Sequence, residues 1–221
     1  MKKIYFLIFL ITLTLTSCNS IKIIDKPVIF DHERDSLTLE YLETRYGLVQ
    51  KTPTINPKMV VVHWTVIPTL EKSFTAFNPA KLPNWRPEIA NASALNVSAQ
   101  FLVDQDGAIY RLMPETNMAR HVIGLNHCAI GIENVGGTGD NPLTKKQLQS
   151  NIKIINYLKK KYPEIDYVIG HLEYTNFEGH ELWLEKDDGY RTEKTDPGIE
   201  FLNEIRKATS KYNWKPVPQI K

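Results

Sequence analysis

The sequence predicts an α/β domain in which helices flank a mixed central β-sheet. Two apolar runs, 59–63 and 129–135, are typical of strands that are buried on both faces. Two further apolar runs, 98–103 and 108–113, are joined by the turn sequence D-Q-D-G and indicate a hairpin. Helical segments alternate with these strands, and this alternation favours one sheet covered by helices.

The first residues have the pattern of an export signal. Lys2 and Lys3 precede an apolar run over residues 4–15, which is too short to span a bilayer comfortably but fits a signal peptide. The run ends in L-T-S-C at Cys18, a sequence that resembles the lipobox of bacterial lipoproteins. An ordinary secretory signal with an incidental cysteine is the alternative. We predict that residues 1–17 are removed as a lipoprotein signal peptide and that Cys18 is lipidated.

Such a lipid anchor would place the protein on the bacterial cell envelope. Two or three acyl chains on one residue give stable membrane attachment, whereas a single chain does not. Asn19 directly after the cysteine is compatible with sorting to the outer membrane, on its periplasmic side. The membrane is therefore one expected partner of the mature chain.

The 221 residues, 42% of them hydrophobic and 24% charged, suit one globular domain. We assign residues 58–210 to this domain and residues 211–221 to a C-terminal tail. Residues 18–57 are expected to hold the lipidated tether and an N-terminal helix. Oligomeric state cannot be derived from these patterns.

The first elements are predicted in chain order. A polar stretch over residues 19–35 is expected to be the tether from the membrane. A helix over 36–46 follows, with Ser36 as its N-cap and Gly47 as its terminator. A short helix over 70–77 then leads into a loop that is interrupted by three prolines.

Two longer helices and one strand complete the domain. The capping box T-K-K-Q opens a helix over 144–162, and the apolar run 167–170 predicts a short strand. The last helix is expected to start at Asp196 with Pro197 in its first position. Phe201, Leu202 and Ile205 would pack this helix on the sheet.

Charge and cysteine content argue against a nucleic-acid partner, a disulfide and a cysteine-based metal site. Removal of residues 1–17 takes away two lysines, which leaves 25 basic residues against 25 acidic ones. With no basic excess and no basic stripe evident in the sequence, we expect no nucleic-acid partner. Once Cys18 is lipidated, Cys128 is the single thiol, so an intramolecular disulfide and a cysteine-based metal site are both excluded.

Five polar residues stand out at the ends of predicted strands and in the loop before the last helix. They are His63, Glu133, His171, Lys194 and Asp196. Two imidazoles and one aspartate with an open fourth position are what a catalytic zinc ion needs. Taken singly, each residue has an ordinary alternative: a structural histidine, a carboxylate in an ion pair, or a solvated loop lysine.

Several segments occur together in a fixed order. The chain contains V-V-V-H-W-T, S-A-Q-F-L-V-D-Q-D-G-A-I-Y-R-L, R-H-V-I-G, N-H-C-A-I-G-I-E, G-H and K-T-D-P-G. This ordered set resembles the zinc-dependent N-acetylmuramoyl-L-alanine amidases, a family that includes the peptidoglycan recognition proteins. The resemblance covers residues 58 to 205, and no single fragment carries it. It implies the single-domain fold of that family.

The resemblance also implies roles for individual residues. His63, His171 and Asp196 match the ligands of the Zn²⁺ cofactor. Glu133 matches a glutamate near the zinc-bound water, and Lys194 matches a lysine that stabilises the transition state. The implied reaction is hydrolysis of the amide bond between N-acetylmuramic acid and L-alanine, with peptidoglycan or a muropeptide as substrate.

The remaining candidates are substrate contacts. His121 falls on the histidine of a W-H-A-G segment of the family, but Arg120 replaces its tryptophan and Val122 its alanine. Trp64 follows the first histidine ligand, and Arg86, Arg111 and Arg120 are candidate partners for the carboxylates of the stem peptide. Ala99 stands where some family members carry a catalytic tyrosine.

A long segment separates the last two expected ligands. The 24 residues between His171 and Asp196 exceed the short turn of simple bacterial members. We expect residues 173–193 to form a flap that contacts the substrate, with a structural excursion as the alternative. His180 within this segment is a rival metal ligand.

Two other functions remain compatible with the sequence. A non-catalytic module that binds peptidoglycan would have the same fold, but such proteins typically lack a zinc ligand. A peptidase that cuts within the stem peptide would keep the zinc and change only the bond. The choice between intact wall, muropeptide fragment and foreign wall as substrate stays open.

Overall fold

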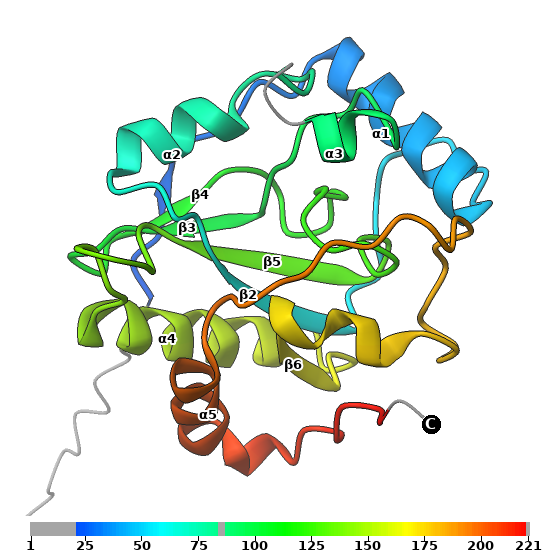
Figure 1. Ribbon diagram of the computed structural model, residues 1–221. Coiled ribbons are helices and arrows are strands. Elements are labelled where there is room, and N and C mark those ends of the chain that lie inside the picture. The colour runs from blue at the N-terminus through cyan, green and yellow to red at the C-terminus, as the bar shows by residue number, and fades with distance from the viewer. Residues whose placement is uncertain (1–20, 84–86, 220–221) are drawn as a thin grey trace, which may run out of the picture.

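The computed structural model of the protein describes residues 21–83 and 87–219 (Figure 1). The signal peptide, the lipidation site Cys18 and the candidate Arg86 lie outside the described residues, so these predictions stand as they are. Within the described part of the chain, no helix is both long enough and apolar enough to cross a bilayer.

The described residues form a six-stranded sheet in the order β1-β4-β3-β5-β2-β6. The strands are β1 (Ile24–Asp25), β2 (Met59–Trp64), β3 (Phe101–Val103), β4 (Ile109–Arg111), β5 (Ala129–Asn134) and β6 (Tyr167–Gly170). The β3–β4 hairpin is antiparallel, and every other neighbouring pair is parallel. This arrangement confirms the predicted mixed sheet.

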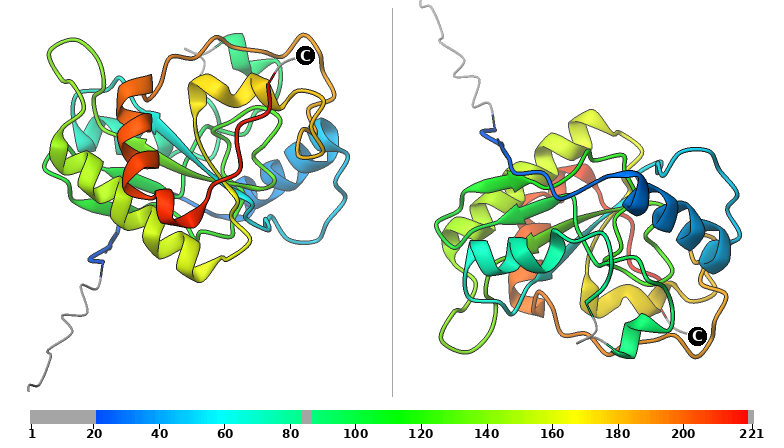
Figure 2. Two further views of the ribbon diagram at one scale, coloured as in Figure 1. Left: turned by 90° about the horizontal axis from the view of Figure 1, so that it is seen from below. Right: turned by 90° about the horizontal axis from the view of Figure 1, so that it is seen from above.

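Helices cover both faces of the sheet (Figures 1 and 2). The helices are α1 (His32–Tyr46), α2 (Leu70–Phe77), α3 (Pro87–Ala90), α4 (Lys145–Lys161) and α5 (Ile199–Ala208), with short 3₁₀ helices η1 (His171–Phe177) and η2 (Ser210–Tyr212). Helices α4 and α5 lie together on one face, whereas α2 and α3 lie on the other. The protein is therefore a single α/β domain, as predicted.

The alternation of side chains along β2 assigns each residue to a face. Val60 and Val62 pack into the core cluster that α4 and α5 build with Ile154 and Ile205. Met59 and Val61 belong to the cluster on the opposite face. Because successive strand residues point to opposite faces, His63 continues the row of Met59 and Val61, away from α4.

Cap residues explain where the helices begin and end. Thr144 forms the predicted capping box with Gln147 at the start of α4. Gly47 ends α1 in the left-handed conformation, with φ 72°, as expected for a glycine terminator. The prediction for the start of α1 is wrong: the helix begins at His32, because the side chain of Asp31 accepts a hydrogen bond from the backbone N–H of Arg34.

The start of the last helix also differs from the prediction. Helix α5 begins at Ile199, and Gly198 occupies the N-cap position, so Pro197 precedes the helix. The packing prediction for this helix is confirmed, since Leu202 and Ile205 are fully buried and Phe201 packs against the same core.

The described part of the predicted tether is folded against the domain. Ile24 and Asp25 form strand β1, which pairs in parallel with β4 at the edge of the sheet. The backbone N–H groups of Lys26 and Val28 continue this pairing by donating to the carbonyls of Arg111 and Leu112. Residues 21–31 therefore belong to the domain, and the prediction of a free tether fails for them.

His127 gives the fold a dependence on pH. Its Nδ1 atom is buried without a hydrogen-bond partner in the described structure, and its ring lies 5.4 Å from that of Tyr46. Burial lowers the pKa of His127 to about 4. The unfolded chain binds this proton below about pH 6.5, so the stabilisation is complete above that value and is lost as the pH falls towards 4.

We expect this group to lower the free energy of unfolding by about 2–3 kcal/mol between pH 7 and pH 4.5. Urea denaturation of the wild type and of His127→Phe at both pH values measures the effect. The variant keeps an aromatic ring beside Tyr46 but cannot bind the proton, so its stability should fall less. Equal pH dependence in the two proteins would contradict the prediction.

Candidate active site

Strand β2, the junction of β6 with η1 and the loop before α5 each contribute one of the expected metal ligands. His63 is on β2 in register with Glu133 on the neighbouring β5. His171 directly follows β6 as the first residue of η1, and Asp196 is in the loop before α5. Gly170 permits this approach, because a Cβ atom there would lie 2.7 Å from Cδ of Pro197.

The three ligand atoms form a compact triangle. Nδ1 of His63 lies 3.0 Å from Nδ1 of His171, and each of these nitrogens lies 3.1 Å from Oδ2 of Asp196. All three residues are buried. The described residues thus contain one group of histidine and acidic side chains that could hold a metal ion, and it is the group expected from the sequence.

His121 lies beside His63 and determines the tautomer of its ring. Nε2 of His121 is 3.3 Å from the carbonyl oxygen of Ala129, which can only accept, so this nitrogen carries the proton. Nδ1 of His121 then accepts from Nε2 of His63, 3.0 Å away. The remaining nitrogen of His63, Nδ1, presents its lone pair to the triangle, as a metal ligand requires.

A glycine makes room for this arrangement. A Cβ atom on Gly131 of β5 would lie 3.0 Å from the ring of His121, closer than ordinary side-chain contacts. His121 is 8% exposed and is also part of the pocket wall. The structure therefore places His121 against the candidate ligand His63, and its predicted contact with the substrate stays a prediction.

The protonation states of His171 and Asp196 at neutral pH favour the binding of a cation. Burial, reinforced by the nearby His63, lowers the pKa of His171 to about 4. Burial alone would raise the pKa of Asp196, but His171 and His63 outweigh it and hold that pKa well below its ordinary value. At neutral pH the pair is a neutral imidazole and a carboxylate, the forms that bind metal ions.

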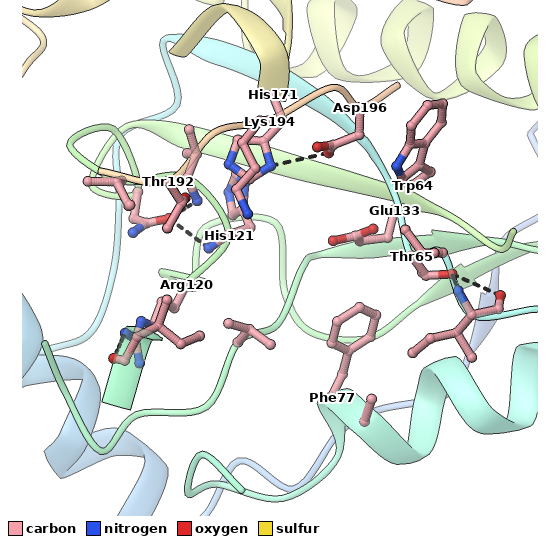
Figure 3. Close-up of a pocket in the computed structure, with 18 of the residues that line it drawn as sticks. Trp64, Thr65, Phe77, Arg120, His121, Glu133, His171, Thr192, Lys194 and Asp196 are labelled. Atoms are coloured by element: carbon pink, nitrogen blue, oxygen red, sulfur yellow. Dashed lines mark hydrogen bonds and ion pairs between the residues drawn. The ribbon is translucent and has the colours of Figure 1, made fainter. Parts of the chain in front are cut away.

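A cavity of about 360 Å³ opens beside the triangle (Figure 3). His171 and Asp196 line it together with three other predicted site residues, Glu133, Lys194 and Trp64. Glu133 and Lys194 are half-buried, and the carboxylate of Glu133 points into the space beside Asp196. The arrangement can therefore present an acid–base group and a cation to a molecule that also contacts a bound metal ion.

Trp64 separates this cavity from a second hollow that continues past α5. The ring packs against Gly137, where a Cβ atom would lie 2.4 Å from its Cγ atom. Trp64 also lines the second hollow, together with Pro197 and Phe201. Its position in both walls fits the predicted substrate contact, which stays a prediction.

The two described arginine candidates lie in different surroundings. Arg120 lines the cavity but is only 3% exposed, and its terminal nitrogens donate to the carbonyls of Ile89, Ser93 and Leu95 and to the hydroxyl of Tyr190. Arg120 thereby links residues 89–95 to the loop that contains Tyr190. Arg111 is on β4 beside Glu115 and Asp25 and is not part of the cavity wall, so its expected role at the substrate is not supported.

The segment between the last two ligands forms part of the cavity wall. Tyr190 and Thr192 line the cavity, and Arg45 anchors the segment through a 2.7 Å ion pair with Glu185. His180 is not part of the ligand group; its Nε2 atom lies 3.4 Å from the hydroxyl of Tyr167. The rival assignment of His180 as a metal ligand is therefore wrong.

Several residues of the cavity wall were not expected from the sequence, and two of them stand out. Tyr41 reaches it from α1, a helix that the sequence assigns to the region before the domain. Val66 stands at the cavity with 59% of its surface exposed and a φ of 60°, which is rare for a β-branched residue. Neither position carries a sequence pattern that distinguishes it from other apolar or aromatic residues.

Solved structures with the same arrangement of elements come from distant organisms. The N-acetylmuramoyl-L-alanine amidase LysC from Clostridium intestinale URNW matches with a TM-score of 0.53 and 23% identity, over 89% of this chain and 100% of its own. Bumblebee PGRP-SA matches with a TM-score of 0.51 and 18% identity, over 89% of this chain and 99% of its own. At these identities the likeness establishes the fold. No curated protein sequence matches the chain.

Two sequence families match different parts of the chain. Residues 1–19 match the prokaryotic membrane lipoprotein lipid attachment site, in agreement with the lipobox. Residues 53–199, more than half of the chain, match the family described as N-acetylmuramoyl-L-alanine amidase. The matched range contains His63, His171 and Asp196, together with Glu133 and Lys194 of the cavity wall. The chain therefore belongs to the N-acetylmuramoyl-L-alanine amidase family.

Proposed function

We propose that the protein is a zinc-dependent amidase that hydrolyses the bond between N-acetylmuramic acid and the L-alanine of peptidoglycan. The observation that carries the proposal is the buried triangle of His63, His171 and Asp196 at the wall of a cavity that also contains Glu133 and Lys194. Family membership supports the same reaction. The substrate is intact peptidoglycan or a muropeptide derived from it.

The ligand triangle suits Zn²⁺. Bonds of about 2.0–2.2 Å in a tetrahedral site separate neighbouring ligand atoms by about 3.3–3.6 Å. The observed separations of 3.0–3.1 Å come within a few tenths of an ångström of this range. Two nitrogens and one carboxylate oxygen are also a common zinc ligand set. When bound, the ion supplies a Lewis acid and lowers the pKa of a water molecule at the open position.

The chain itself supplies proton transfer and charge stabilisation. The carboxylate of Glu133 takes a proton from the attacking water and later delivers it to the departing amine of L-alanine. The ammonium group of Lys194 stands at the same cavity and stabilises the negative charge that develops on the carbonyl oxygen. His121 holds His63 in the tautomer that binds the cation.

A bacterial envelope location follows from the lipid attachment site at Cys18. We propose that the acyl chains lie in the outer membrane and that the domain faces the periplasm, as Asn19 suggests. Palmitate labelling of the intact chain, compared with Cys18→Ala, tests the anchor. Labelling that persists in the variant would contradict it.

The two rival functions predict different products. A module that only binds peptidoglycan has no need for three competent ligands, and all three are present here. A stem-peptide peptidase would use the same metal site on another bond. Incubation of residues 19–221 with purified sacculi, with and without a chelator, followed by mass spectrometry separates these cases. Free peptides that begin with L-alanine support the amidase, whereas internally cut peptides or no release would contradict it.

Lys194→Ala is expected to lower kcat by two to three orders of magnitude, on the basis of about 2.7–4 kcal/mol for one oxyanion donor. Zinc content should stay at the wild-type level, because the lysine is not one of the ligands. Lys186→Ala, a change of an exposed lysine in the same loop region, serves as the matched control. Loss of zinc from Lys194→Ala would give the residue a structural role instead.

His121→Ala is expected to weaken zinc binding about 10- to 100-fold, because Nε2 of His63 would lose its acceptor. Titration of the apoprotein against a competing zinc dye measures the change. A residue that only contacts the substrate would raise KM and leave the zinc affinity unchanged. That outcome would contradict the positioning role.

A further inference from the structure

Helix α4 presents a strongly basic face to solvent, which contradicts the expectation that the chain has no basic stripe. The helix has 17 residues, among them six lysines and no acidic residue. Lys159 and Lys161 are paired with Asp166 and Glu115. The other four, Lys145, Lys146, Lys153 and Lys160, are exposed and form no ion pair within the described structure. At 3.6 residues per turn these four fall within an arc of about 100°, and we call them the lysine face.

The described chain begins beside this helix (Figures 1 and 2). Ile21 and Ile23 pack against the core cluster to which α4 contributes Ile154 and Leu158. Cys18 stands three residues before Ile21, and three residues span at most about 11 Å. A lipid on Cys18 would therefore keep Ile21 within about 11 Å of the bilayer surface, a distance close to the Debye length of about 8–10 Å.

We propose that the lysine face docks on the anionic lipid headgroups of the bilayer that holds the acyl chains. The proposal rests on the proposed lipid anchor at Cys18. Lysine near an anionic bilayer surface strengthens binding about fivefold per residue, so four lysines together make a large contribution. Ile24 adds an apolar side chain, 38% exposed, next to the point where the anchor enters.

Acidic residues limit the effect of the lysine face at its N-terminal end, where Glu200 and Glu204 of α5 line the same hollow as Lys145. Asp104 and Asp106 belong to the β3–β4 turn, which contacts the N-terminal part of α4 through bonds from Thr144 to Gln105 and from Ser150 to Gly107. These carboxylates offset part of the charge of Lys145 and Lys146. Lys153 and Lys160 lie further along the helix and are expected to contribute most.

Docking through α4 fixes the orientation of the active site. His63 and Glu133 project from the sheet face opposite to the one that α4 covers. The domain would therefore sit with its lysine face on the lipid and its catalytic face turned towards the cell wall. A lipid anchor alone would leave this orientation free.

Vesicle sedimentation tests the docking without the acyl chains. The mature chain with Cys18→Ala is mixed with phosphatidylcholine vesicles that contain about 30% phosphatidylglycerol, and with phosphatidylcholine vesicles alone. We expect at least tenfold stronger partitioning onto the anionic vesicles. Replacing the four lysines of the lysine face with glutamine should lower this partitioning at least tenfold, with an unchanged melting temperature.

The matched control removes four lysines from the rest of the surface, at Lys51, Lys72, Lys81 and Lys186. It has the same net charge as the first variant, so it should keep most of the partitioning. Equal losses in the two variants, or equal binding of the wild type to both vesicle types, would overturn the proposal. A loss confined to purified sacculi would identify the wall as the partner instead. Because the assay reads no turnover, its failure is distinguishable from failure of the amidase or of lipidation.

Discussion

Asp196→Ala is expected to lose stoichiometric zinc and at least about a thousandfold of amidase activity, which corresponds to the several kcal/mol that a catalytic metal supplies. Oδ2 of Asp196 is the one anionic atom of the ligand triangle and lies 3.1 Å from each imidazole nitrogen. Without it, two neutral imidazoles would face each other across the site. Zinc per chain by mass spectrometry, together with peptide release from sacculi, measures both losses.

Asp188→Ala provides the matched control, because Asp188 is an exposed aspartate in the segment before the ligand. It should retain both zinc and activity. An Asp196→Ala protein that keeps one zinc ion per chain would remove Asp196 from the ligand set. Activity that survives the loss of zinc would refute the proposed metal-dependent reaction.

Glu133→Gln is expected to keep its zinc and lose two to four orders of magnitude in kcat, the usual contribution of a positioned acid–base group. The change keeps the size of the side chain and removes only its ability to take a proton. Glu193→Gln, an exposed residue next to Lys194, is the control. Single-turnover rates at saturating muropeptide separate this effect from altered binding.

Two outcomes would contradict the role of Glu133. A rate within about threefold of the wild type would exclude it as the general base, since such a group contributes at least about a hundredfold. Loss of zinc would show that the carboxylate stabilises the ligand triangle instead. The in-register pairing of Glu133 with His63 makes this second measurement necessary, because the two residues are neighbours across the β2–β5 ladder.

Local patterns were sufficient to predict most of the sheet, whereas the candidate ligand set came from the resemblance to a family. The apolar run before His63 and the capping box at Thr144 each depend on residues close in sequence, and both are confirmed. The candidate ligands could be named because the motif K-T-D-P-G and the two histidines occur in a fixed order with the other segments of that family.

The errors concern contacts between residues that are far apart in sequence. Strand β1 forms because Ile24 and Asp25 pair with the outer edge of β4, which lies about 85 residues later in the chain. The bonds from Arg120 to three backbone carbonyls were not predicted either, because no spacing rule indicates them, and its contact with the substrate stays a prediction. Ser36 and Asp31 are both competent N-caps, so sequence alone could not decide between them.

Through strand β1, the segment that follows the proposed lipid anchor becomes part of the fold. Its hydrogen bonds shield the outer edge of β4, which would otherwise offer unpaired backbone groups to another copy of the chain. If the protein is lipid-anchored as proposed, proteolysis can release an intact domain only by cutting within a short stretch of the chain. A cut before Ile21 would free an intact domain. A cut after Val28 would remove β1, expose the unpaired backbone groups of the β4 edge and favour aggregation.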